Sequence, residues 1–186
     1  PCGWSSVTMT TMFGRWYVPS RRAEGVCADP AAGTIITNGA TNTIGGSVAG
    51  AGNVISGNTA YGVNLLSGGN TVAGNTIGLK ADGSAKLANA YGVWITSSNN
   101  TIGGTTTLSR NVISGNTNDG VNINGASVTG NVVQGNYIGT DLTGSSATGF
   151  GNSRYGVGIE TSANGNSIGG TVSGAGNVIS GNTSYG

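Results

Sequence analysis

The residues best suited to chemistry in this chain lie around a glycine that recurs along it. Immediately before that glycine stands a tyrosine four times and an aspartate once: Tyr61, Tyr91, Asp119, Tyr155 and Tyr185. The following positions that should point outward carry Asn64 and Leu66, Trp94 and Thr96, Asn122 and Asn124, and Gly158 and Glu160. Aromatic rings pack on the apolar faces of sugars, while amides and carboxylates hydrogen-bond sugar hydroxyls. The pattern predicts a carbohydrate-binding face formed by Tyr61, Tyr91, Trp94, Asp119, Asn122, Tyr155 and Tyr185.

The row of tyrosines also has a purely structural interpretation. Aromatic residues stacked at equivalent positions of a sheet stabilise it whether or not a ligand binds. Trp94 is the best probe of the difference. The positions taken as its equivalents in other repeats carry Ile35, Asn64, Asn122 and Gly158, so the stack offers no packing reason for an indole there.

Three charged residues beside this face are candidates for catalysis: Asp119, Arg154 and Glu160. Glycoside hydrolysis needs two carboxyl groups about 5–9.5 Å apart. Five residues at about 3.3 Å each place Asp119 and Glu160 roughly 16 Å apart along the strand, unless the corner folds back. Asp119 and Arg154 lie one turn and one residue apart, which predicts a surface ion pair worth about 0–1 kcal/mol.

Composition excludes several other kinds of site. The chain has no histidine, which removes Ser-His-Asp and Cys-His machinery and every histidine-ligated metal site. With a net charge of +1 and 7% charged residues, neither nucleic acid nor an anionic membrane is the expected partner. No apolar run approaches the roughly 20 residues of a membrane span. We expect no metal and no cofactor. A disulfide between Cys2 and Cys27 would suit an exported protein, but one pair does not establish the compartment.

These candidate residues are positioned by an internal repeat. Residues 42–62 and 166–186 are identical at 17 of 21 positions, and residues 100–120 form a third, looser copy. Near-identity at a fixed offset is the signature of stacked repeats. The element Gly-Val-x-Ile marks successive repeats at Gly62, Gly92, Gly120 and Gly156, and a degenerate first copy begins at Gly33.

Each repeat offers three short apolar strands, bounded by glycine and asparagine. The first follows the repeated glycine. The second is marked by Ile44, Val72, Ile102, Val132 and Ile168, and the third by Val54, Ile77, Val112, Ile138 and Val178. This pattern predicts an all-β, right-handed parallel β-helix of about five turns with three parallel sheets. The single repeat domain spans residues 33–186. Residues 1–32 differ in composition and form either an N-terminal cap or extraneous, poorly ordered sequence.

Asparagine has an expected structural role at the corners. Hexapeptides of the form Asn-x-x-x-Gly-Asn occur at 53–58, 70–75, 111–116, 131–136 and 177–182. Asparagine and glycine both tolerate the left-handed backbone of a sharp corner. Asparagine amides at equivalent corners can also hydrogen-bond along the stack. The alternative is that these rows of asparagines contact a ligand.

The run NTIGG…NVISGN…GVxI…NVVQGNYIGTD resembles the right-handed parallel β-helix repeats of large exported and cell-surface bacterial proteins. These share their architecture with the pectate-lyase-like superfamily, and the resemblance covers residues 33–186. Its members include polysaccharide lyases, glycoside hydrolases, adhesins and passive stalks. The resemblance implies that a lyase of this kind would need several carboxylates around a calcium ion and an Arg or Lys base beside them. Asp82 and Asp141 should lie roughly 10 Å apart along the axis, too far to share one calcium.

We therefore expect an extracellular or cell-surface bacterial repeat module that is structural or adhesive and binds carbohydrate on its Tyr/Trp/Asn face. The alternative is a polysaccharide lyase or glycoside hydrolase that uses Asp119, Arg154 or Glu160. A clustered, desolvated acid–base group would favour the enzyme, and scattered, solvated charges would favour the module. The last repeat has no cap in the sequence, so we also expect an end-to-end homodimer through its strand edges.

Overall fold

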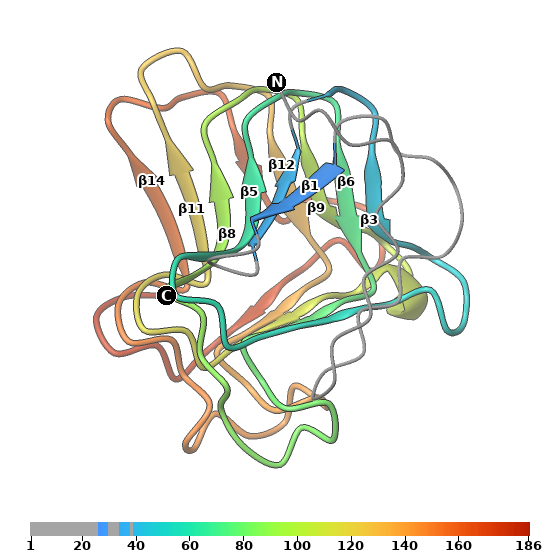
Figure 1. Ribbon diagram of the computed structural model, residues 1–186, viewed down its shortest axis with the longest axis vertical. Helices are drawn as coiled ribbons and strands as arrows, with labels where there is room; N and C mark the ends of the chain where they lie inside the picture. Colours follow the sequence, from blue (N-terminus) through green and yellow to red (C-terminus); the bar gives the residue numbers. More distant parts are fainter. Residues whose placement is uncertain (1–25, 30–33, 38) are drawn as a thin grey trace.

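A computed structural model describes residues 26–29, 34–37 and 39–186, with side chains described from residue 39 onward. Within these residues the protein is all-β apart from one short 3-10 helix, Thr107–Ser109. The strands form three sheets (Figure 1). No helix in the described part of the chain has the length and apolar character to span a membrane.

Sheet 1 has six strands and sheets 2 and 3 have five each. Sheet 1 contains β1 (Val26–Asp29), β2 (Thr34–Thr37), β5 (Tyr61–Leu65), β8 (Tyr91–Ile95), β11 (Val121–Asn124) and β14 (Val157–Glu160). Sheet 2 contains β3 (Thr43–Gly45), β6 (Thr71–Ala73), β9 (Thr101–Gly103), β12 (Val132–Gln134) and β15 (Ser167–Ile168). Sheet 3 contains β4 (Val54–Ile55), β7 (Thr76–Ile77), β10 (Val112–Ile113), β13 (Tyr137–Ile138) and β16 (Val178–Ile179).

The chain visits the three sheets in the same order in every repeat. Each strand of sheet 1 from β2 onward is followed by one of sheet 2 and one of sheet 3 before the chain returns to sheet 1. All pairings between successive repeats are parallel. This arrangement is compatible with the expected parallel β-helix, and we call one such pass a turn.

The strand β1 is an exception, because it pairs antiparallel with β2 at the edge of sheet 1. It belongs to the segment 1–32 for which a cap was considered. Most of that segment, including Cys2, lies outside the described residues, so the cap stays a prediction.

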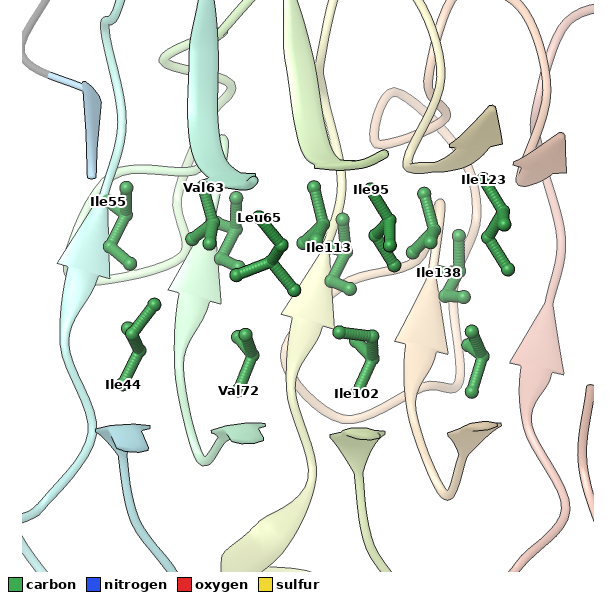
Figure 2. Close-up of a cluster of buried hydrophobic side chains, with 14 of the residues drawn as sticks. Ile44, Ile55, Val63, Leu65, Val72, Ile95, Ile102, Ile113, Ile123 and Ile138 are labelled. Carbon is green, nitrogen blue, oxygen red and sulfur yellow. The ribbon is translucent and has the colours of Figure 1, made fainter. Parts of the chain in front are cut away.

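The core lies between the three sheets, where apolar side chains form columns that run from turn to turn (Figure 2). Strand alternation places Val63, Val93 and Val121 of sheet 1 in one fully buried column. A second column of sheet 1 comprises Leu65, Ile95 and Ile123. The columns from sheets 2 and 3 meet these two in a continuous cluster.

In sheets 2 and 3 several residues that the sequence analysis aligned with one another are offset by one residue in the observed register. In sheet 3 the row of Ile77 runs through Ile55, Ile113, Ile138 and Ile179, so Val54, Val112 and Val178 occupy the neighbouring row of Thr76. In sheet 2 Ile102 pairs with Val133 and not with Val132. These errors arise because two adjacent apolar residues do not reveal which one faces the core.

The first repeat is also displaced by one residue relative to the expectation. Ile36, not Ile35, pairs with Asn64 and therefore shares the row of Trp94. The degenerate copy at Gly33 lacks the valine that fixes the alignment in the other repeats.

Asparagine columns join the turns at three corners. In each column the Oδ1 atom of one asparagine accepts both the backbone N–H and the side-chain Nδ2–H of its counterpart in the preceding turn. The columns are Asn42, Asn70, Asn100, Asn131 and Asn166, Asn53, Asn75, Asn111, Asn136 and Asn177, and Asn58, Asn89, Asn116, Asn152 and Asn182. The expected hydrogen bonding along the stack is confirmed, and these amides are engaged within the protein instead of forming an exposed ligand row.

Glycine and asparagine have different structural roles at these corners. The five hexapeptide glycines all have a positive φ: Gly57, Gly74, Gly115, Gly135 and Gly181. None of the hexapeptide asparagines does. Glycine therefore supplies the left-handed residue at these corners, and the contribution of asparagine is its amide.

We predict that Asn111→Ala lowers the free energy of unfolding by more than about 2 kcal/mol. Asn111 is fully buried, and its loss removes the acceptor of the Asn75 backbone N–H and Nδ2–H. Each buried group left without a partner costs about 1–3 kcal/mol. Chemical denaturation measures the change. The control is Asn164→Ala, an exposed asparagine outside the columns, which should cost less than about 0.5 kcal/mol. Equal losses for the two variants would contradict a role for the columns.

Candidate functional site

The candidate site lies on the outer face of sheet 1, on the strands β5, β8, β11 and β14. Alternation along each strand turns its valines inward and the intervening residue outward. The parallel register aligns these intervening residues in one outer row of Asn64, Trp94, Asn122 and Gly158. Tyr61 pairs with Tyr91 and Tyr155 forms a bridge with Tyr185, so the tyrosines before the repeated glycines form a second row.

Three aromatic rings form a packed group at one end of this face, which we call the aromatic cluster. The ring centroids of Tyr61 and Tyr91 are 5.7 Å apart, and those of Tyr61 and Trp94 are 5.4 Å apart. Tyr91 and Trp94 meet edge-to-face, with centroids 4.8 Å apart and an interplanar angle of 66°. All three side chains are half-buried, so the rings touch one another and still present part of their surface to solvent.

Four polar side chains form an adjoining group, the ionic cluster, which consists of Asp119, Asn122, Arg154 and Glu160. The Nη1 atom of Arg154 lies 3.2 Å from Oδ2 of Asp119, and its Nη2 atom forms an ion pair with Oε1 of Glu160. The Nδ2 atom of Asn122 donates to Oδ2 of Asp119 at 2.6 Å and to Oε2 of Glu160 at 3.0 Å. One guanidinium and one amide thus hold the two carboxylates together.

Tyr155 completes the surroundings of the ionic cluster. Its backbone N–H donates to Oδ1 of Asp119 at 3.1 Å, and its ring lies 4.1 Å beneath the guanidinium carbon of Arg154. On the far side Tyr155 contacts Tyr185, with ring centroids 5.7 Å apart. The ionic cluster therefore lies between two groups of aromatic rings on the same face.

The expected separation of roughly 16 Å between Asp119 and Glu160 is wrong. Both carboxylates accept hydrogen bonds from the same nitrogen atom of Asn122, at 2.6 and 3.0 Å, so these two oxygen atoms lie less than about 6 Å apart, near the short end of the range for glycosidase pairs, about 5–9.5 Å. The expectation counted residues along the strand. Glu160 instead pairs with Asn124 of the neighbouring strand β11, and its side chain reaches back to Asn122. The expected ion pair of Asp119 and Arg154 is present, but it is not the surface pair that the sequence suggested, because Asp119 is fully buried.

The electrostatics of the ionic cluster favour the charged forms of Glu160 and Arg154. The hydrogen bond from Asn122 lowers the pKa of Glu160, opposed by desolvation and reinforced by Arg154. The hydrogen bond with Glu160 in turn raises the pKa of Arg154. Two acidic side chains face one guanidinium, so the formal net charge of the cluster is −1. A general acid needs a raised pKa and an eliminating base must lose its proton, so the shifts at Glu160 and Arg154 run against both roles.

Asp119 contributes a fully buried carboxylate to this face. Burial of a charge is costly unless it is paired and hydrogen-bonded, and Arg154, Asn122 and the backbone of Tyr155 meet that requirement. The buried charge also acts on the aromatic cluster. Desolvation first, and the charge of Asp119 second, raise the pKa of Tyr91, so its hydroxyl stays protonated at neutral pH.

Two buried amide oxygens in the outer row have no hydrogen-bond partner among the described residues: Oδ1 of Asn64 and Oδ1 of Asn122. Register places these asparagines on either side of Trp94. Unpaired buried acceptors are uncommon in native proteins, and each calls for an explanation.

Gly158 contributes to the shape of the candidate site, and sequence reasoning did not single it out for this. A Cβ atom at this residue would lie 3.1 Å from Nδ2 of Asn122, 3.2 Å from the ring of Tyr155 and 3.3 Å from Oδ2 of Asp119. The ionic cluster and the ring of Tyr155 thus occupy the space that a side chain at position 158 would need. The available signal was glycine at the variable position of Gly-Val-x-Ile.

Neither Asp82 nor Asp141 belongs to this face. Each caps its own loop: Asp82 accepts the backbone N–H of Ser84, and Asp141 accepts those of Thr143 and Ser145. Within the described residues no group of three or more acidic, histidine or cysteine side chains is placed to hold a metal ion.

Comparison with models of protein families, with curated proteins and with solved structures finds no match to this chain.

We predict that the stabilising contribution of Glu160 is lost on acidification. Its pKa in the folded protein is lowered from 4.5, so its charged form stabilises the fold above that value, and protonation removes the gain as the pH falls through the lowered pKa. At neutral pH Glu160→Gln should cost up to about 1 kcal/mol, the worth of a half-exposed ion pair. Thermal unfolding of both proteins between neutral and strongly acidic pH measures this. A difference that stays constant across the range would contradict the pairing of Glu160 with Arg154 and Asn122.

Proposed function

We propose that this chain is a right-handed parallel β-helix repeat module, exported to or displayed on a bacterial surface, that binds carbohydrate on the outer face of sheet 1. The observation that carries the proposal is the aromatic cluster lying directly beside the ionic cluster on one face. The resemblance of the repeats to those of exported and cell-surface proteins supports the location.

The chemistry of the face suits a sugar chain. Half-exposed rings offer flat apolar surface to the C–H faces of sugars. Glu160 has 26% of its side chain exposed and Arg154 has 36%, so both can reach sugar hydroxyls beside the rings. The neighbouring strands β8 and β11 lie about 4.8 Å apart. A chain of sugars running across the strands can therefore contact the aromatic and ionic clusters together.

A glycoside hydrolase is the second candidate, and the short distance between Asp119 and Glu160 is the observation that favours it. These carboxylates are clustered and one is fully buried, which is the arrangement expected of an enzyme. The lowered pKa of Glu160 and the shared bonds to Arg154 argue for the binding module. Release of reducing ends from a bound polysaccharide, abolished by Glu160→Gln, would establish the hydrolase instead.

We predict that Trp94→Ala weakens glycan binding by more than about 1 kcal/mol, about fivefold in Kd. The substitution removes the ring that contacts both Tyr61 and Tyr91. Calorimetry against a panel of oligosaccharides measures the change. Tyr137→Ala is the matched control, because Tyr137 is a half-buried aromatic residue of sheet 3 that packs on Arg110. Equal effects of both variants, or loss of stability without loss of binding, would mean that the rings serve only the scaffold.

A further inference from the structure

The outer face of sheet 1 is short of positive charge. The ionic cluster has two carboxylates for one guanidinium. Two other bases are engaged elsewhere: Lys86 donates to the carbonyl oxygen of Gly151, and Arg110 donates to Gly135 and lies over Tyr137 in sheet 3. The charge of Arg154 is already neutralised by its two partners, so an anionic ligand would meet a face with a net negative charge.

The same face has a surplus of hydrogen-bond acceptors. The unpaired oxygens of Asn64 and Asn122 are both acceptors, and the two residues are 8% and 0% exposed. The amide of Asn122 cannot be reversed to change this, because its nitrogen is held between two carboxylates. Both oxygens have almost no solvent-accessible surface, so they add negative potential to the face without contacting a ligand directly, and the exposed acceptor is the carboxylate of Glu160. A group that carries positive charge and only donates hydrogen bonds complements this potential and this carboxylate, and an ammonium group has these properties.

We propose that the face prefers carbohydrate with protonated amino groups, such as polymers of glucosamine, over neutral sugars and over uronates. This inference rests on the proposed carbohydrate binding and names its ligand class. The ammonium group lies beside the Glu160 carboxylate, and the sugar ring packs on Trp94 and Tyr91. The aromatic cluster does not enclose the cation, since its centroids are 4.8–5.7 Å apart and the rings already touch. A cation therefore approaches the exposed side of the rings, where cation–π attraction adds to the carboxylate charge.

The test compares glucosamine oligomers with the same oligomers after full N-acetylation, since the pair differs only in the charged amine. Titration calorimetry at low salt, with the amines protonated, should give at least about fivefold tighter binding of the amine form, the effect of one unit charge at close range in water. Raising the salt concentration should reduce this preference. In Glu160→Gln the preference should fall to about equal affinity, because the excess negative charge is gone.

The control variant is Asp82→Asn, which removes one negative charge from the loop between β7 and β8 and should keep the preference. Equal or tighter binding of the acetylated oligomers, or of a uronate oligomer, by the wild-type protein overturns this inference and leaves the proposed carbohydrate binding intact. Binding of none of the oligomers overturns both. Because salt dependence is measured on the wild-type protein, a failure of Glu160→Gln to fold does not remove the test.

Discussion

The three asparagine columns are the interaction on which the rest of this structure depends. Parallel strands of two to five residues supply few hydrogen bonds of their own, so the turns need another source of alignment. From the second asparagine of each column onward, the side-chain oxygen accepts two hydrogen bonds from the counterpart in the preceding turn, one from the backbone and one from the amide, as between Asn111 and Asn75. Buried amides that are fully paired specify one arrangement, since a shift would leave polar groups unpaired.

Alignment of the turns creates both the core and the outer face. On the inside it stacks Val63 on Val93 and Val121, so each turn buries apolar surface that it could not bury alone. On the outside the same register places Trp94 beside Asn64 and Asn122. The ionic cluster is likewise made between turns, because Arg154 and Glu160 of one turn reach Asp119 and Asn122 of the turn before. A shift of one residue in the register would separate Arg154 and Glu160 from Asp119 and Asn122.

Much of the fold could be predicted from the sequence because the same strand and corner patterns recur in every repeat. The strands of all three sheets, the asparagine columns and the row of tyrosines could be predicted from recurrence alone. Single residues were harder to place. Adjacent apolar pairs such as Val112 and Ile113 do not reveal which member faces the core, and the degenerate first repeat offered Ile35 where the register has Ile36. The sequence also does not show in which direction a long side chain extends. The short distance between Glu160 and Asp119 was therefore found only in the three-dimensional structure.

We propose that ligand contacts one face of the protein, the outer side of sheet 1, through Trp94 and Glu160. Chemical-shift mapping by NMR during titration with glucosamine oligomers tests it most directly, since it reports every perturbed residue at once. The expected result is a set of perturbed signals confined to β5, β8, β11 and β14, including the indole N–H of Trp94 and the side-chain amide of Asn122. Perturbations centred on sheet 3 around Tyr137, or spread evenly over the three sheets, would contradict it.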